Sequence, residues 1–233
     1  MDDTSDTSRR ALLAASGLTL ATLAGCSGGT GGESTDTSGD GGTTTAEGGA
    51  GRETATPRTD RLSAPVAGDP DADVTVAVYE DFACPHCGTF NEEVYPTIRS
   101  EYVDSDRIRY EHHDFPIPVD ETVSWQAPNA ARAVQATVGD EAFYEYADLL
   151  FANQGSLEPN AYAALAEEVG ADSSTVKTAA VDRVYDVTIE ADRERGIEAG
   201  VRGTPTAFVN GEEVATTTEA LTEAIDAAVS DST

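Results

Sequence analysis

The segment Cys84-Pro85-His86-Cys87 (the CPHC motif) places two cysteines two residues apart in a chain of 233 residues with three cysteines in total. A pair with this spacing can bind a metal ion, close a small disulfide loop or exchange electrons with other thiols. A structural zinc site normally takes four ligands. The third cysteine, Cys26, belongs to an N-terminal leader, so four cysteines cannot meet in one chain.

Histidine could complete a metal site only if two imidazoles joined the two cysteines. The three histidines of the chain are His86, His112 and His113. His86 lies between the cysteines, and the adjacent His112 and His113 point to opposite faces if their segment is a strand. We therefore expect no metal site. A purely structural disulfide is also disfavoured, because closing so small a loop removes little entropy from the unfolded chain.

A redox pair fits the local sequence best. Alternating valines over residues 74–78 predict a strand that runs into the motif. Pro85 suits the first turn of a helix, where a missing N–H is not needed. Cys84 would then lie beside unpaired N–H groups at the positive end of the helix dipole, which favours the reactive thiolate. His86, if protonated, would add to this effect, and the more buried Cys87 would be the resolving thiol.

The rest of the pattern predicts two halves of one mixed sheet separated by helices. A helical face follows the motif, and a second strand covers residues 107–113. A helical insertion spans about residues 122–200. The chain returns as a hairpin over residues 204–216, with Asn-Gly at its turn, and ends in a helix over residues 219–229. The order βαβ, helical insertion, ββα indicates an α/β domain with one core over residues 62–231.

The CPHC motif after "VYEDFA", with "RGTPTAFVNG" far downstream, resembles the DsbA family of thioredoxin-fold oxidoreductases. The resemblance covers roughly residues 66–229 and includes the helical insertion. It implies a thioredoxin-like fold with a redox-active Cys84–Cys87 disulfide and no separate cofactor.

The same resemblance assigns a role to the downstream Gly203-Thr204-Pro205 segment. It implies a cis Thr204–Pro205 peptide bond beside the disulfide, with backbone groups of Thr204 offered to the substrate. Gly203 would give conformational freedom just before this bond. Without the resemblance, the segment indicates only a turn before a strand.

Acidic residues near the motif depart from the family pattern. Many thioredoxin-fold enzymes have a buried acid six residues before the first cysteine, where this chain has Val78. Glu80 and Asp81 lie nearer the motif and could take part in proton transfer. Each could equally be a solvated side chain, which the acidic composition favours. We interpret His112 and His113 as strand-end residues without a catalytic part.

The N-terminus indicates export. Paired arginines precede the apolar run 11–25, which is shorter than the ~20 residues that span a bilayer. This pattern predicts a Tat-type signal peptide over residues 1–25. Its end, Leu-Ala-Gly-Cys, resembles the lipobox of lipoproteins and implies lipidation of Cys26, where two acyl chains would anchor the protein stably. Residues 26–61, rich in Gly, Ser and Thr, are expected to form a flexible tether.

The charge balance excludes one class of partner and indicates an environment. The chain has 43 acidic and 14 basic side chains and a formal net charge of −29. Nucleic acid would be repelled by such a chain. The composition is similar to that of proteins from halophilic archaea, where molar salt screens the repulsion between acidic side chains.

These features predict an extracytoplasmic thiol–disulfide oxidoreductase, with a dithiol oxidase of exported proteins favoured over a reductase or isomerase. Cys84 would form a mixed disulfide with a cysteine-containing exported protein, and Cys87 would release the product. The resemblance suggests a quinone-linked membrane protein as the redox partner. A peptide-binding module and a Cu(I) metallochaperone are the alternatives. Met1 is the only methionine, which speaks against the metallochaperone.

Overall fold

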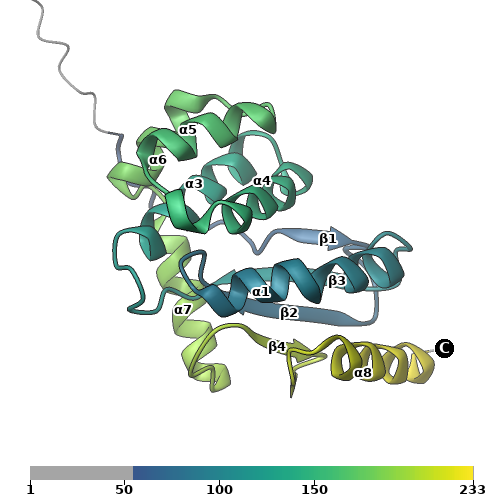
Figure 1. The fold of residues 1–233 in the computed structure, drawn as a ribbon. Helices are drawn as coiled ribbons and strands as arrows, with labels where there is room; N and C mark the ends of the chain where they lie inside the picture. Colours follow the sequence, from purple (N-terminus) through teal and green to yellow (C-terminus); the bar gives the residue numbers. More distant parts are fainter. Residues whose placement is uncertain (1–54, 233) are drawn as a thin grey trace, which may run out of the picture. The chain divides into compact units, whose positions relative to one another are not determined.

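A computed structural model describes residues 55–232, and a five-stranded mixed sheet lies at the centre of this part (Figure 1). The strand order is β1-β3-β2-β4-β5; β2 and β3 are parallel, and the other neighbours are antiparallel. The strands are β1 (Val66–Gly68), β2 (Thr75–Glu80), β3 (Arg109–Asp114), β4 (Thr206–Val209) and β5 (Glu212–Val214). The predicted signal peptide, the proposed lipidation site Cys26 and the tether up to residue 54 lie outside the described residues.

The central strand β2 follows the valine pattern from which it was predicted. Val76 and Val78 are fully buried, and Val74, just before the strand, is 1 % exposed. This strand is flanked by β3 on one side and β4 on the other. It ends directly before the CPHC motif, so the sheet fixes the starting point of the loop that carries the cysteines. The short edge strand β1 was not predicted.

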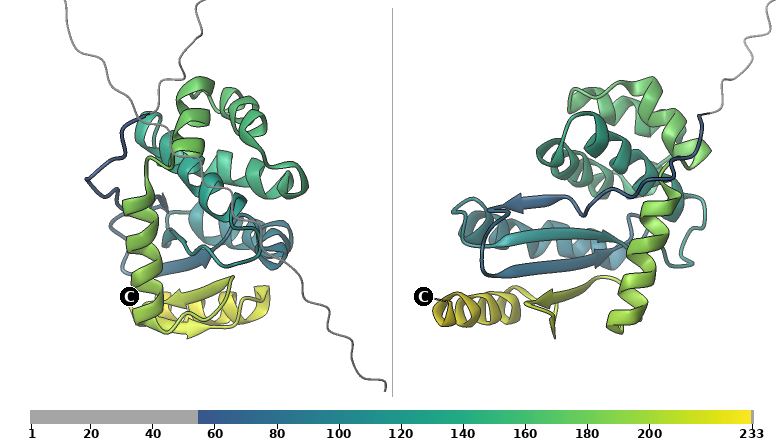
Figure 2. Two further views of the ribbon diagram at one scale, coloured as in Figure 1. Left: turned by 90° about the vertical axis from the view of Figure 1, so that its left-hand side faces the viewer. Right: turned by 180° about the vertical axis from the view of Figure 1, so that it is seen from behind.

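Helices cover both faces of the sheet (Figures 1 and 2). The first face carries α1 (Pro85–Glu93), α2 (Tyr95–Ile98), a π-helical turn (Arg99–Val103) and α8 (Thr218–Asp231). The opposite face is crossed by α7 (Asp186–Ala199), which packs against β3. The expected apolar face after the motif is buried but does not form one continuous helix. Pro96 lies in the first turn of α2, where its missing N–H marks a new helix start.

A helical insertion lies between β3 and β4. It consists of α3 (Val123–Thr137), α4 (Asp140–Ala152), the 3-10 turn η2 (Gln154–Ser156), α5 (Pro159–Glu168), α6 (Ser173–Asp182) and α7. Local sequence sets several of these ends. Pro159 opens α5, and the side chain of Asp172 caps α6 by accepting from the N–H of Thr175. The observed order of elements confirms the predicted α/β class.

The boundary of the predicted tether at residue 61 is wrong. The N–H of Ala55 donates to Asp182 Oδ2 at 2.8 Å, and the N–H of Arg58 donates to the Val184 carbonyl at 2.9 Å. The side chain of Ala55 also packs against the core. Residues 55–61 therefore run along the helical insertion, because backbone hydrogen bonds hold a segment that has few apolar side chains. Over residues 55–232, no helix has the length and apolar character needed to cross a membrane.

Candidate active site

The loop between β2 and α1 carries the CPHC motif. Cys84 precedes α1 with an extended backbone (φ −79°, ψ 119°), and Pro85 follows in the first turn. The Cys84 N–H donates to the carbonyl of Asp81 at 2.9 Å, while its own carbonyl accepts from the N–H groups of Cys87 and Gly88. Cys84 therefore lies at the N-terminus of α1, where helix N–H groups lack partners within the helix.

The two thiols differ in their pKa values, although both are reduced and buried. A hydrogen bond from the Cys87 thiol, aided by Thr204 and by the N–H groups of Cys87 and His86, lowers the pKa of Cys84 to about 5. Burial, the bond to Cys84 and the charge of Glu80 raise the pKa of Cys87 far above its ordinary value. At neutral pH the pair therefore holds its negative charge on Cys84 and its proton on Cys87.

The two residues between the cysteines are exposed. Pro85 lies in the first turn of α1, and the backbone N–H of His86 is one of the groups that lower the pKa of Cys84. The His86 side chain lines a groove together with Thr204 and Pro205. His86 therefore lies on the same side of the motif as the cis-proline loop.

The loop before β4 lies beside the motif, because β4 pairs with β2. The Thr204–Pro205 peptide bond is cis, and the Thr204 carbonyl accepts from Cys84 Sγ at 3.4 Å. Gly203 has no left-handed φ, and a Cβ there would meet open space. The backbone conformation at Gly203 is therefore not one that only glycine readily adopts. The Gly203 carbonyl instead accepts from the hydroxyl of Thr206 at 2.8 Å.

Glu80 is buried behind the cysteines and is not the solvated acid that composition favoured. It is 3 % exposed, and Asn91 Nδ2 donates to its Oε1 at 2.7 Å. The same Asn91 nitrogen donates to the carbonyl of Cys87 at 3.1 Å. Glu80 thus supplies the buried acid that was missing at Val78, two residues nearer the motif. The sequence contained no sign that Asn91 joins this acid to the second cysteine.

Asp81 is also buried, so the solvated interpretation is wrong for this residue as well. Its two oxygens accept from the N–H groups of Ala83 and Ile117, each at 2.8 Å. Burial raises the pKa of Asp81 despite these two bonds. The Asp81 side chain thus joins the motif loop to the segment after β3, and its contacts are those of a structural residue.

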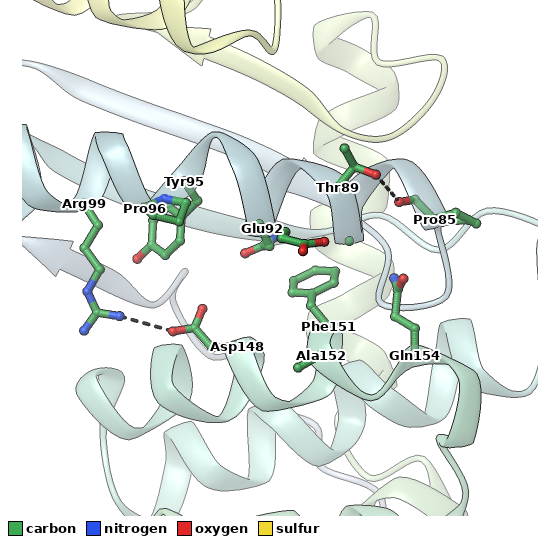
Figure 3. Close-up of a pocket in the computed structure, with 12 residues that line it drawn as sticks. Pro85, Thr89, Glu92, Tyr95, Pro96, Arg99, Asp148, Phe151, Ala152 and Gln154 are labelled. Carbon is green, nitrogen blue, oxygen red and sulfur yellow. Dashed lines mark hydrogen bonds and ion pairs between the residues drawn. The ribbon is translucent and has the colours of Figure 1, made fainter.

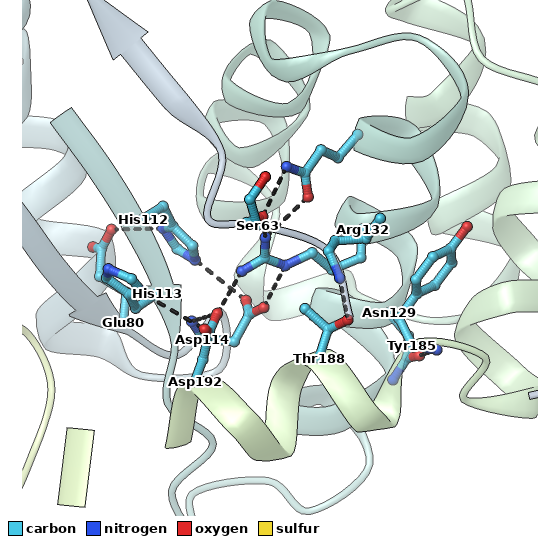
Figure 4. A network of polar contacts seen from close by, with 12 residues as sticks. Ser63, Glu80, His112, His113, Asp114, Asn129, Arg132, Tyr185, Thr188 and Asp192 are labelled. Atoms are coloured by element: carbon cyan, nitrogen blue, oxygen red, sulfur yellow. Dashed lines mark hydrogen bonds and ion pairs between the residues drawn. The ribbon is translucent and has the colours of Figure 1, made fainter. Parts of the chain in front are cut away.

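His112, on β3, continues the polar contacts behind the motif (Figure 4). Its Nδ1 lies 3.2 Å from Glu80 Oε2, and its Nε2 lies 3.3 Å from Asp114 Oδ1. Burial lowers the pKa of the imidazole, but these two carboxylates outweigh it and raise the pKa to about 9. His112 is therefore a buried cation at neutral pH. The neighbouring His113 points to the other face, where it stacks on Tyr79.

Arg132, on α3, joins the helical insertion to this set of charges (Figure 4). Its side chain is fully buried, with Nε 2.7 Å from Asp114 Oδ2 and one terminal nitrogen 2.6 Å from Asp192 Oδ2. The second terminal nitrogen donates to the Ser63 carbonyl at 3.1 Å. One guanidinium thus connects β3, α3, α7 and the N-terminal segment.

Two grooves flank the first turns of α1. A groove of about 710 Å³ lies between α1, α2 and α4, and Gln154 lies at its end nearest the motif (Figure 3). A groove of about 580 Å³ lies on the side of the cis-proline loop. It is lined by His86, Thr89, Phe90, Glu93, Val94, Thr204, Pro205, Thr216, Thr217 and Thr218. Over residues 55–232, no cluster of three or more His, Cys, Asp or Glu side chains is arranged to hold a metal ion.

Comparison with known families places the fold. A family model described as "Thioredoxin" matches residues 61–227 of the chain. The chain belongs to this thioredoxin family. The family assignment agrees with the observed sheet, the N-terminal position of the CPHC motif on α1 and the thioredoxin-like fold expected from the sequence.

Solved structures share this architecture. BdbD from Bacillus subtilis has a TM-score of 0.66 and 22 % sequence identity, and the match covers 76 % of this chain and all of BdbD. DsbA from Chlamydia trachomatis has a TM-score of 0.60 and 21 % identity, with 77 % of this chain and 95 % of DsbA covered. At these identities the likeness shows a shared fold.

Sequence relatives fall into two kinds. The Na(+)/H(+) antiporter NhaA 1 of Salinispora arenicola is 37 % identical over 146 residues, which are 63 % of this chain and 21 % of the antiporter. Disulfide bond formation protein D of Bacillus subtilis is 24 % identical over 155 residues, which are 63 % of this chain and 67 % of that protein. The chain thus spans about a fifth of the antiporters, and ion exchange is not carried over from their name.

Proposed function

We propose that the chain is an extracytoplasmic thiol–disulfide oxidoreductase that uses Cys84 and Cys87 as its redox pair. The observation that carries the proposal is the asymmetry of the two thiols. Cys84 has a pKa of about 5 at the start of α1, and Cys87 stays protonated behind it. The thioredoxin fold and the groove beside the cis-proline loop support the same function.

The favoured direction is oxidation of a substrate dithiol. A substrate thiolate attacks Cys84 Sγ of the Cys84–Cys87 disulfide, the S–S bond breaks, and Cys87 leaves and takes up a proton. A second substrate thiolate then attacks the substrate sulfur of the mixed disulfide and expels Cys84 as a thiolate. The substrate loses two electrons and gains a disulfide, while the pair gains both electrons and is reduced.

The electrostatics of Cys84 favour this direction over reduction of substrates. A lowered pKa stabilises the thiolate, and therefore the reduced form of the pair, relative to the disulfide. Stabilising the reduced form makes the disulfide a stronger oxidant. A low pKa also makes Cys84 the better leaving group, which speeds release of the oxidised substrate.

Glu80 is the best-placed group for proton transfer at Cys87. Its charge acts on the Cys87 thiol, and Asn91 connects its carboxylate to the Cys87 backbone. We assign to Glu80 the transfer of the proton that Cys87 gains on reduction and loses on reoxidation. Asp81, whose oxygens are occupied by two backbone N–H groups, is left out of this step.

The substrates we propose are cysteine-containing exported proteins, with a membrane redox protein restoring the disulfide. The predicted signal peptide and the lipid anchor at Cys26 would hold the domain at the extracellular face of the membrane. The name of the Bacillus relative, disulfide bond formation protein D, supports a role in disulfide formation. The net charge of −29 speaks against nucleic acid as a partner.

The proposal is tested by mixing the oxidised protein with a reduced, cysteine-containing model protein in high salt. We expect one substrate disulfide for each Cys84–Cys87 pair that becomes reduced, and no reaction with Cys84→Ala. In a glutathione buffer, Cys87→Ala should accumulate mixed disulfides, because the resolving thiol is missing. Stoichiometric copper retained by the reduced protein, together with no substrate oxidation, would support the metallochaperone instead.

A further inference from the structure

The helical insertion contacts the backbone of the reactive cysteine through one side-chain amide. Gln154, in η2 directly after α4, donates from Nε2 to the carbonyl of Cys84 at 2.8 Å and to the carbonyl of Phe82 at 2.9 Å. Figure 3 shows this side chain extending from the insertion toward the start of α1. Two carbonyls of the motif loop, those of Phe82 and Cys84, thus accept from a residue that lies 70 positions away from Cys84 in the sequence.

The Gln154 side chain fits beside α1 because Gly88 has no side chain at the point of contact. A Cβ built on Gly88 would lie 2.4 Å from Gln154 Oε1, closer than real Cβ atoms come to any neighbour. The clashing atom is the far end of a flexible side chain, so Gln154 would move away, while Gly88 has an ordinary helical φ. Glycine therefore serves here to admit the amide and not to allow a special backbone conformation.

A second contact binds the same loop to the same part of the insertion. The Phe151 ring, at the end of α4, packs on the Phe82 ring with centroids 4.7 Å apart. Residues 82–84 are thus held by an apolar contact on Phe82 and by polar contacts on two carbonyls. The apolar contact fixes where the loop lies, whereas the amide gives the Cys84 carbonyl a side-chain donor in addition to the N–H groups of Cys87 and Gly88.

We propose that Gln154 is a positioning residue through which the helical insertion sets the reactivity of Cys84. The amide holds the Cys84 carbonyl, and with it the Cys84 backbone that carries Sγ. In this position Sγ lies near the N–H groups of His86 and Cys87, which favour its thiolate. Without the amide the loop gains freedom, Sγ spends less time near these groups, and its thiolate is stabilised less.

The test measures how fast iodoacetamide modifies Cys84 in the reduced, full-length protein at a series of pH values, with mass spectrometry to distinguish Cys84 from the other cysteines. For Gln154→Leu we expect about threefold slower modification near pH 5 and about fivefold slower modification well below it, the size expected when one lost hydrogen bond raises the pKa of Cys84. The rates should converge with those of the unmodified sequence above pH 8, where Cys84 is a thiolate in both proteins.

Gly88→Ala provides a second variant that disturbs the same contact while Gln154 itself is kept. Alanine favours a helix more than glycine does, so this variant is expected to fold, yet its Cβ displaces Gln154. We expect the same shift in the pH profile as for Gln154→Leu. In the Gln154→Leu background, Gly88→Ala should add no further shift, because there is no amide left to displace.

Gln135→Leu is the matched control. Gln135 is half-buried like Gln154 and also donates from Nε2 to two acceptors, Ser63 O at 3.1 Å and Asp140 Oδ1 at 3.0 Å, neither of which belongs to the motif. Its Oε1 accepts from Arg132 at 2.9 Å, so its loss bears on the stability of the fold. Its loss should lower the unfolding midpoint and leave the pH profile of Cys84 unchanged. The inference is overturned if Gln154→Leu and Gly88→Ala keep the original profile and change only stability, as Gln135→Leu does.

The inference rests on the proposed function in taking Cys84 as the reactive thiol, but the two fail in different ways. Modification by a small reagent does not require substrate proteins or a redox partner. If the oxidised protein fails to oxidise a model protein while Gln154→Leu still shifts the pH profile, the proposed function is wrong and the positioning role stands.

Discussion

Two buried polar regions of this domain handle charge in opposite ways. Around Cys84 a single thiolate is stabilised by uncharged groups, namely a thiol, a threonine and backbone N–H groups. The Arg132 guanidinium, in contrast, lies within 3 Å of two buried carboxylates, Asp114 on one side and Asp192 on the other. Cys84 can therefore gain or lose a proton during thiol chemistry, whereas the paired ions around Arg132 keep their charges.

The comparison separates reactivity from stability. Changes near Cys84 should alter the pH dependence and rates of thiol chemistry and leave the folded state largely intact. Changes at Arg132 should unfold the protein and leave the thiols unaltered for as long as it is folded.

The largest effect is expected for Arg132→Met. This change leaves the Asp114 and Asp192 carboxylates buried without their partner, and breaking a buried ion pair in this way removes about 3–5 kcal/mol from the free energy of unfolding. Urea unfolding monitored by circular dichroism measures the loss. Arg99→Met is the control, because its pair with Asp148 is about 40 % exposed on both sides and is expected to be worth less than ~1 kcal/mol. Equal losses for both variants would contradict the comparison.

The next effect is the pH dependence of the reduced protein. The pKa of Cys84 is lowered from 9.0 to about 5 in the folded state, so this thiolate contributes stability above the unfolded pKa and loses it as pH falls through 5. The unfolding midpoint of the reduced form, relative to the oxidised form, should therefore rise between pH 5 and pH 9. Iodoacetamide modification of Cys84 should fall about tenfold from pH 7 to pH 4, in line with the fraction of thiolate. A pH profile of modification with its midpoint near pH 9 would contradict the lowered pKa of Cys84.

The smallest effect is expected for Glu80→Gln. Removing this carboxylate takes away the group proposed to accept the Cys87 proton, so Cys87 should attack a Cys84–glutathione mixed disulfide several-fold more slowly, below the usual ~10²-fold range of general base catalysis. Rapid acid quenching followed by mass spectrometry measures the step. Cys84 modification by iodoacetamide should stay within about twofold. Asp81→Asn, which alters a structural acid in the same loop, should change stability and not this rate; the reverse result would exchange the roles of the two acids.

Local patterns in the sequence predicted the parts of the site that are close together along the chain. The valines of β2, Pro85 and the two cysteines are all within about a dozen residues, and their types determine a strand, a helix start and a redox pair. The Asn-Gly turn and the closing helix were also local signals. The same holds for the helical insertion, whose observed helices from Val123 to Ala199 lie within the predicted range.

The polar contacts behind the cysteines could not be predicted in this way. Glu80, His112 and Arg132 meet only because β2 and β3 are parallel and α3 packs beside them, which brings distant residues together. In a chain with 43 acidic side chains, a buried glutamate has no local mark that separates it from a solvated one. The role of Gln154 could not be predicted either, because it depends on the space left by Gly88 and not on the residues next to Gln154 in the sequence.

The most direct test of the account is the reduction potential of the Cys84–Cys87 pair, measured in high salt by equilibration with glutathione buffers. A stabilised Cys84 thiolate and a protonated Cys87 predict a potential well above that of thioredoxin, about −270 mV, and nearer to the −120 mV of a strong dithiol oxidant. A potential at or below about −270 mV would contradict the account and assign the protein to the reductases.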